Sequence, residues 1–194
     1  LKDLAQKLGL SISTVSRALQ NNPRIKKDTI ARTKKLAKEM GYLPDVLAKS
    51  LKNNKTHTIG VIVPEISHVF FSSVIDGIEE ITYKDGYTIL VTKSNENIER
   101  EVLNTDSLIS NRVAGVIASI SQETKNGKHF NQILDRGIPL VLFDRVLDDL
   151  AVPKIVGDDF EKGYEIVNHL IDSGYRNIAY LAGPPHLKIT VNRM

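Results

Sequence analysis

Short apolar runs alternate with amphipathic stretches from residue 58 onward, and this alternation limits the possible folds more than any other feature. The runs lie at six places: 58–63, 87–92, 114–118, 139–143, 154–156 and 177–182. Continuous apolar runs are typical of strands buried on both faces, and we expect helices of roughly 12 to 16 residues between most of them. The pattern therefore predicts an α/β fold with a doubly wound parallel sheet.

Both ends of the sequence fall inside expected helices. Leu1 belongs to an apolar stripe with Leu4, Ala5 and Leu8, and residues 187–194 begin another helical pattern. We therefore expect the sequence to be a fragment of a longer protein, with a truncated α/β part.

The first part of the chain has a different rhythm, with three short helical patterns in succession. Gly9 follows the first helix, Ser11 is the expected N-cap of the second, and the third ends near Gly41. Within the second helix, Ile12 and Val15 are expected on the apolar face. These patterns predict a small helical domain before the sheet.

Charge separates the same two regions. Residues 1–57 carry 13 Lys and Arg against 4 Asp and Glu, a net charge of +9, whereas the remaining residues carry −6. A compact basic module suggests a polyanion as partner, because neutralised phosphates release counterions and so contribute affinity. A merely solvated basic face would have the same charge, so charge alone leaves both interpretations open.

The joint between the first two helices is short, and the second helix has a small, polar and basic face. This arrangement fits a helix-turn-helix whose second helix enters the major groove of DNA. Arg17 can donate two hydrogen bonds to guanine, and the hydroxyls of Ser13 and Thr14 can contact bases or phosphates. A structural three-helix bundle would have the same core, so that alternative stays open.

Enzyme, metal and membrane functions lack sequence support. The sequence has no cysteine, and its five histidines are scattered without the spacing of metal ligands. It contains no nucleophile elbow, dinucleotide-binding or zinc motif, and no apolar run reaches the roughly 18 to 20 residues that span a bilayer. We therefore expect no catalysis, no cofactor, no metal and no membrane association.

Several phrases of the sequence together resemble the LacI/GalR family of transcription regulators. In the helical part they are LKDLAQKLGLS (1–11), STVSRAL (13–19), GYLP (41–44) and LAKSL (47–51). In the α/β part they include IGVIVP (59–64), DGIE (76–79), RVAGVI (112–117) and AGP (182–184). The resemblance covers essentially the whole chain.

The resemblance implies a domain organisation in four parts. Residues 1–44 would form a helix-turn-helix headpiece, and residues 45–57 a hinge helix and linker. Residues 58–157 would form the N-terminal subdomain of a periplasmic-binding-protein-like effector domain, and residues 158–194 the start of its C-terminal subdomain.

The resemblance also implies which residues contact DNA. In the headpiece, Ile12, Ser13 and Arg17 would face bases, with Thr14 beside them. Four residues would lie near phosphates: Ser11, Ser16, Arg24 and Thr29.

In the hinge helix, the resemblance implies that Ala48, Leu51 and Lys52 contact DNA, with Leu51 wedged into the minor groove. The alternative role for the hinge is a simple spacer. Two residues depart from the family pattern: Asp45 replaces a common asparagine, and Lys26 replaces the serine that caps the third helix.

An effector site is expected where the strands end, because open parallel sheets bind ligands outside the carboxyl ends of their strands. Asp144, Arg145 and Ser119 follow predicted strands, although Asp144 and Arg145 could instead form an internal salt bridge. By resemblance, the loop after the first strand offers an aromatic ring and a polar atom, with Phe71 alternatively part of the core. The further candidates are Ser67, His68, Phe70, Phe71, Asp158 and Asp159.

The function implied by the resemblance is repression of transcription. A homodimer, or a dimer of dimers, would bind a pseudo-palindromic operator in double-stranded DNA. A small molecule would control this binding allosterically: a sugar or sugar phosphate, with a nucleobase as the alternative. The protein would then be cytoplasmic, in association with the bacterial nucleoid. The alternatives are a sugar-binding protein of the same fold and a sugar-processing enzyme with a regulatory module.

Overall fold

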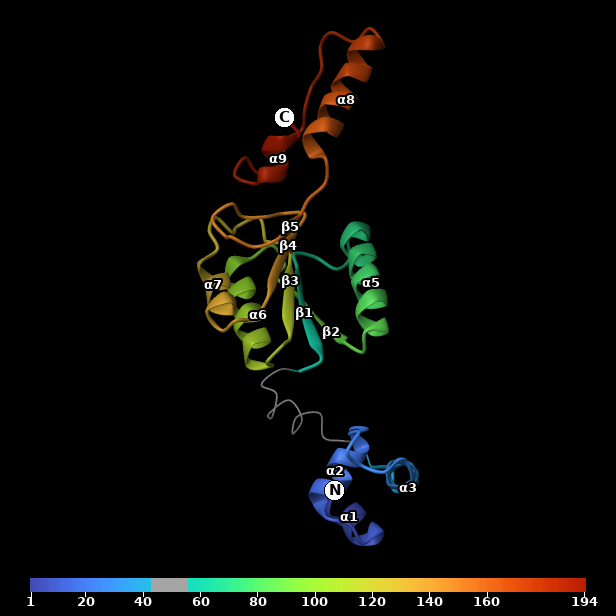
Figure 1. Cartoon of the computed structure of the whole chain (residues 1–194). Coiled ribbons are helices and arrows are strands. Elements are labelled where there is room, and N and C mark those ends of the chain that lie inside the picture. Colours follow the sequence, from blue (N-terminus) through green and yellow to red (C-terminus); the bar gives the residue numbers. More distant parts are fainter. Residues whose placement is uncertain (43–55) are drawn as a thin grey trace. The chain divides into compact units, whose positions relative to one another are not determined.

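The computed structural model describes residues 1–42 and 56–194 and divides them into two compact units, one on each side of residues 43–55 (Figure 1). The first unit contains the helices α1 (Lys2–Leu8), α2 (Ile12–Leu19) and α3 (Lys27–Glu39). All three contribute to one core, in which Leu4, Ala5, Val15 and Ala37 are buried. The expected three-helix domain is therefore present.

The turn between α1 and α2 has the conformation that its sequence requires. Gly9 has φ 63°, and its N–H donates to the carbonyls of Ala5 and Gln6. This left-handed geometry costs glycine little and places the chain for a new helix two residues later. Ser11 then caps α2, because its side chain accepts a hydrogen bond from the N–H of Thr14. Lys26 makes no side-chain cap for α3, as the sequence predicts.

The second unit is built on a five-stranded parallel sheet in the order β2-β1-β3-β4-β5. The strands are β1 (Thr58–Val63), β2 (Thr88–Lys93), β3 (Gly115–Ala118), β4 (Leu140–Phe143) and β5 (Lys154–Ile155). Val61 pairs with Val91 on one side and with Ile117 on the other. The predicted doubly wound parallel sheet is therefore confirmed.

Helices cover both faces of the sheet (Figure 1). The helix α5 (Val69–Lys84) lies on one face, and α6 (Ile98–Ser110) and α7 (Lys128–Asp135) lie on the other. Alternate residues of β1 enter the two cores: Val61 and Val63 pack with Phe71, whereas Ile62 packs with Leu108. This period of two explains why a strand buried on both faces is continuously apolar.

The last part of the chain differs from the sequence prediction at one element. Helices α8 (Asp159–Asp172) and α9 (Lys188–Asn192) form, but residues 177–182 form no strand and are exposed. A strand needs a neighbour to accept and donate its ladder hydrogen bonds, and no described residue pairs with this segment. The prediction of a strand at 177–182 was therefore wrong for this chain.

A close contact between β1 and α6 predicts a measurable difference between two glycines. A Cβ atom on Gly60 would lie 2.6 Å from Cδ1 of the buried Leu108, whereas one on Gly77 in α5 would meet nothing within 4 Å. We expect Gly60→Ala to lower the free energy of unfolding by about 1 to 3 kcal/mol through overpacking. Gly77→Ala should raise it by about 0.5 to 1 kcal/mol, because alanine loses less backbone entropy in a helix.

Chemical denaturation of the two variants and the parent protein measures both effects. Both variants add the same methyl group, and the two positions differ in what surrounds that group. Each variant therefore serves as the control for the other. Equal changes in the two variants would contradict the packing of β1 against α6.

Candidate nucleic-acid interface and ligand cleft

The helix α2 turns one face into the core and the opposite face to solvent. Val15 and Ala18 are completely buried, whereas Ser13 and Arg17 are exposed. Ile12 is 45% exposed and is not part of the core of this unit, although the apolar pattern placed it on the same face as Val15. This helix therefore presents an arginine, a hydroxyl and an aliphatic side chain together, which can contact the edges of bases.

Hydroxyl groups gather at the N-terminus of α2. The Oγ of Ser11 lies 2.9 Å from Oγ of Ser13 and 2.8 Å from Oγ1 of Thr14, and it accepts from the Thr14 N–H at 3.1 Å. Ser16 is half-buried on the same helix. Ser11 therefore orders the end of the helix, and its neighbours keep hydroxyls available at the surface.

The other two headpiece candidates lie in the segment between α2 and α3 and in the first turn of α3. Arg24 is exposed, and its N–H donates to Oδ1 of Asn22 at 3.0 Å. Thr29 is half-buried, and its carbonyl accepts from Oγ1 of Thr33 at 2.7 Å. The guanidinium of Arg24 thus extends from a fixed turn.

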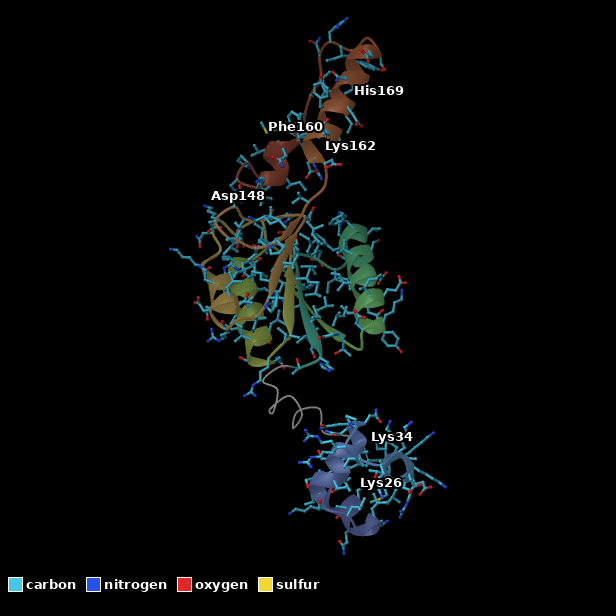
Figure 2. All side chains as sticks on the ribbon, in the orientation of Figure 1. Lys26, Lys34, Asp148, Phe160, Lys162 and His169 are labelled. Atoms are coloured by element: carbon cyan, nitrogen blue, oxygen red, sulfur yellow. The ribbon has the colours of Figure 1, made fainter. Side chains whose placement is uncertain are left out.

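Basic side chains on this unit are free of acidic partners within the described chain. Residues 1–42 contain ten Lys and Arg against three Asp and Glu. None of these basic groups forms an ion pair with another described residue. Six of them, all exposed, belong to α3 and its N-cap, and Figure 2 labels two: Lys26, Lys27, Arg32, Lys34, Lys35 and Lys38. Such a surface attracts a polyanion.

The proposed hinge residues Ala48, Leu51 and Lys52 lie outside the described residues, as do the expected helix 45–52 and Asp45.

A cleft of about 600 Å³ lies in the second unit, where strands of the parallel sheet end. It combines residues after β1, β2 and β4 with residues near the end of the chain. Its lining consists of Glu65, His68, Phe70, Phe71, Glu96, Asp144, Arg145, Tyr180, Leu181, Gly183, Pro184, Leu187, Ile189, Thr190 and Arg193. The topology places a cleft there because the strand order reverses between β1 and β3.

Five of the candidate effector residues meet in this cleft: His68, Phe70, Phe71, Asp144 and Arg145. Asp158 and Asp159 instead line a second hollow of about 500 Å³, which shares Tyr180 and Arg193 with the cleft. Ser67 is exposed and lines neither hollow. Ser119 is completely buried, and its Oγ has no hydrogen-bond partner among residues 1–42 and 56–194.

The two phenylalanines of the loop after β1 differ in their surroundings. Phe71 is 5% exposed and makes edge contacts with Phe70 and Phe143, with ring centroids 5.2 and 6.3 Å apart. Phe70 is 46% exposed. Phe71 therefore belongs to the core as well as to the cleft wall, and Phe70 offers its ring to a ligand.

Arg145 has an acidic partner that the sequence analysis did not identify. Its Nη1 lies 2.8 Å from both carboxylate oxygens of Glu96, in the loop after β2. The suggested salt bridge between Asp144 and Arg145 does not form among the described contacts. The sequence signal for Glu96 is its position, because residues 94–97 follow the predicted strand at 87–92 just as Asp144 follows the strand at 139–143.

Asp144 combines an unusual backbone with a perturbed carboxyl group. Its φ of 56° lies in the left-handed region, which is sparsely populated for non-glycine residues and is often found at functional sites. Burial raises the pKa of its carboxyl group, and the guanidinium groups of Arg145 and Arg193 oppose that rise. Arg193, also absent from the candidates, donates from Nε to Asp159 at 2.7 Å.

The described residues give no support for metal or membrane chemistry. No group of three or more acidic or histidine side chains among them is placed to hold a metal ion. None of their helices combines the length and the apolar composition needed to cross a bilayer. The cleft has hydrogen-bonding groups and an aromatic ring, which suits the binding of a polar small molecule.

Comparison with protein families gives two adjoining matches. Residues 1–45 match "Bacterial regulatory proteins, lacI family", and residues 56–194 match "Periplasmic binding proteins and sugar binding domain of LacI family". The second match alone covers more than half of the chain.

Individual relatives agree with these matches. The chain is 30% identical to catabolite control protein A of Priestia megaterium, over 93% of this chain and 54% of that protein. It is 34% identical to the HTH-type transcriptional repressor PurR of Vibrio campbellii, over 94% of this chain and 54% of that protein. The chain therefore spans about half the length of these curated relatives.

Solved structures share the fold. A lac repressor dimer bound to operator and the anti-inducer ONPF matches with a TM-score of 0.81 at 22% identity, over 98% of this chain and 58% of that chain. A periplasmic binding protein/LacI transcriptional regulator from Alkaliphilus metalliredigens, complexed with D-xylulofuranose, matches with a TM-score of 0.61 at 32% identity, over 71% and 49% of the two chains.

The perturbed carboxyl group in the cleft predicts a pH-dependent effect of Asp144→Asn. The folded protein holds this proton more tightly than the unfolded chain does, so ionisation of Asp144 reduces stability. That cost is present above the folded pKa and vanishes as the pH falls below the unfolded pKa of about 3.9. We expect Asp144→Asn to be more stable than the parent at pH 7 and equal to it near pH 3, by thermal unfolding.

Asp148→Asn provides a control of opposite sign. The Nζ of Lys188 lies 2.7 Å from Asp148 and lowers the pKa of that exposed carboxyl group. Its small contribution to stability is present at pH 7 and is lost as the pH falls through the folded pKa. A stability difference for Asp144→Asn that does not change between pH 3 and pH 7 would contradict the burial of Asp144.

Proposed function

The chain belongs to the LacI family of bacterial regulatory proteins, and from this membership we propose that it is the DNA-binding and effector-sensing part of a transcriptional repressor. The observation that carries the proposal is the polar face of α2, where Ser13 and Arg17 are exposed opposite the buried Val15 and Ala18. A helix of this kind can lie in the major groove with its short side chains against base edges.

The electrostatics of the first unit support this role. Its basic side chains have no acidic partner among the described residues, so they can neutralise phosphates without first breaking ion pairs. In this proposal Ile12, Ser13, Thr14 and Arg17 face bases, and Ser11, Ser16, Arg24 and Thr29 lie near phosphates. Ala48, Leu51 and Lys52 act from a hinge helix within residues 45–57.

The second unit binds the effector in this proposal. A polar ligand in the cleft contacts five residues: His68, Phe70, Phe71, Asp144 and Arg145. Closure of the cleft then brings Asp158 and Asp159, which follow the sheet in sequence, into contact with the ligand. In this proposal Ser67 and Ser119 contact the effector only if closure of the cleft moves the loops that carry them. The effector is a sugar or a sugar derivative, in keeping with the sugar-bound relative of similar fold.

The mechanism is a shift between two populations of a homodimer. Two headpieces bind the two halves of a pseudo-palindromic operator, and effector binding changes the fraction of the dimer in the DNA-competent arrangement. By linkage, an effector that weakens operator binding binds less tightly to the protein on its operator, and a corepressor does the reverse.

Selection of binding sites from a random duplex pool tests the proposal. The selected duplex is then titrated at several salt concentrations against a scrambled duplex. A palindromic site bound at least about 10³-fold more tightly than scrambled DNA supports a specific regulator. Binding that is equal for both duplexes and falls steeply with salt would reduce the first unit to a basic tether.

Two arginines of the first unit separate base reading from phosphate binding. Arg17→Ala should weaken binding to the selected operator by about 1 to 3 kcal/mol and leave scrambled DNA less affected, since a base contact is lost. Arg24→Ala removes the same charge and should weaken both duplexes alike. Equal losses on both duplexes for Arg17→Ala would contradict its contact with a base.

Two phenylalanines separate ligand contact from core packing. Phe70→Ala should weaken binding of a sugar that alters operator affinity, with little change in stability, because the Phe70 ring is 46% exposed. Phe71→Ala should lower the free energy of unfolding by about 3 to 5 kcal/mol, because its ring is buried in the core. Calorimetric titration and chemical denaturation measure the two quantities. Unchanged sugar affinity in Phe70→Ala would remove that residue from the effector site.

A further inference from the structure

We infer that the cleft selects an uncharged, hydroxyl-rich effector and rejects phosphorylated or carboxylated ones, because Glu96 already pairs with Arg145 and neutralises its charge. The inference rests on the proposed function only in taking the cleft as the effector site. It narrows the effector class and assigns a specificity-determining role to Glu96.

The contact between Glu96 and Arg145 is close and sheltered. Nη1 of Arg145 lies 2.8 Å from each oxygen of the Glu96 carboxylate, and the two side chains are only 21% and 28% exposed. Partial burial weakens screening by water and salt, so such a pair is stronger than one on the open surface. An anionic ligand would either displace this carboxylate from Nη1 or approach Nε and Nη2 beside a carboxylate that already neutralises the guanidinium.

Glu96 is held in place independently of Arg145. Its Oε2 accepts from the Gln122 N–H at 2.8 Å, and the neighbouring Ser121 N–H donates to the buried Glu101 at 2.6 Å. Asn95 and Glu96 both have left-handed backbones, with φ of 52° and 58°. The turn that they form is fixed to β1, because the N–H of Asn95 donates to the carbonyl of Pro64 at 2.9 Å.

The second guanidinium of the cleft is also paired. Nε of Arg193 lies 2.7 Å from Oδ1 of Asp159, whose side chain is 11% exposed. Together with Asp144, these groups comprise three carboxylates and two guanidinium groups, a net charge of −1 when all are ionised. An anion entering the cleft meets uncompensated negative charge, and like charges at an interface select against a ligand.

A sugar ring suits the same groups. Asp144 accepts no hydrogen bond from a described residue, so its carboxylate is available to hydroxyl donors. The exposed ring of Phe70 provides an apolar surface for the C–H face of a sugar. Hydroxyl groups can also donate to Glu96 without breaking its pair with Arg145, because a carboxylate offers about four lone-pair sites.

Inorganic phosphate is the probe that tests the masking of Arg145, because it does not depend on knowing the effector. Thermal unfolding of the full-length protein is followed in phosphate and in sodium chloride of equal ionic strength. Glu96→Gln should show a greater phosphate-dependent rise in Tm than the parent, since Arg145 is released while the Gln122 contact is kept. Phosphate stabilises most proteins by exclusion and can bind the basic headpiece, so the comparison between variants carries the result.

Two controls assign the effect. Glu99→Gln removes the same charge three residues away, at an exposed position without an ion pair among the described residues, and should respond as the parent does. The double variant Glu96→Gln/Arg145→Gln should lose the gain. A Glu96→Gln response equal to that of the parent, or a gain that persists in the double variant, would overturn the inference.

Matched ligands extend the test to the effector itself. Calorimetric titration compares neutral pentoses and hexoses with their own monophosphates. A neutral sugar that binds should lose at least about tenfold in affinity when phosphorylated, and Glu96→Gln should reduce that ratio. A phosphate ester that binds the parent more tightly than its neutral sugar would overturn the inference. A sugar that binds without changing operator affinity would contradict the proposed function and leave this inference intact.

Discussion

The parallel pairing of β1 with both β2 and β3 is the constraint from which the second unit follows. Parallel neighbours cannot be joined by a tight turn. The connections from β1 to β2, from β2 to β3 and from β3 to β4 therefore cross the sheet as helices, which cover both faces. The crossover from β1 to β2 uses α5 on one face, whereas the crossover from β2 to β3 uses α6 on the other (Figure 1). The loops after β1 and β2 therefore diverge from neighbouring strands and open a cleft between them. Glu65, Glu96 and Asp144 come from three different loops, and only this topology brings them to one wall.

Sequence patterns predicted the fold wherever the deciding contacts are local or repeated. The period of burial in β1 and the cap residues Gly9 and Ser11 depend on neighbours within a few residues, so composition and spacing were sufficient. The segment 177–182 failed for the opposite reason. Its apolar composition is typical of a strand, but a strand exists only when a second one pairs with it, and no described residue pairs with this segment. Local propensity cannot supply a partner.

The candidate site was predictable in position and only partly in composition. The rule that ligands bind after parallel strands found Asp144 and Arg145, and both line the cleft. The same rule cannot tell which side chain pairs with which, because Glu96 and Arg145 are 49 residues apart in sequence. Arg193 lines the cleft from the far end of the chain, on a segment whose position depends on tertiary structure.

Ser119 is the opposite case, a residue that the rule selected but that does not line the cleft. It follows a strand, yet its side chain is buried. Its unsatisfied hydroxyl is a local cost for which we have no structural explanation.

Arginine side chains have opposite effects on anion binding in the two units. The effect depends on whether a carboxylate is paired with the guanidinium group. In the first unit Arg17 lies on an exposed helix face without a carboxylate partner among the described residues, so the condensed counterions of a polyanion would be released when it binds. In the second unit Arg145 is half-buried and its Nη1 contacts both oxygens of Glu96, so an incoming anion would meet a guanidinium whose charge is already neutralised. A count of basic residues would treat the two arginines alike. The difference arises from burial and from one carboxylate, and it allows a single chain to attract phosphates with one surface while its cleft disfavours them.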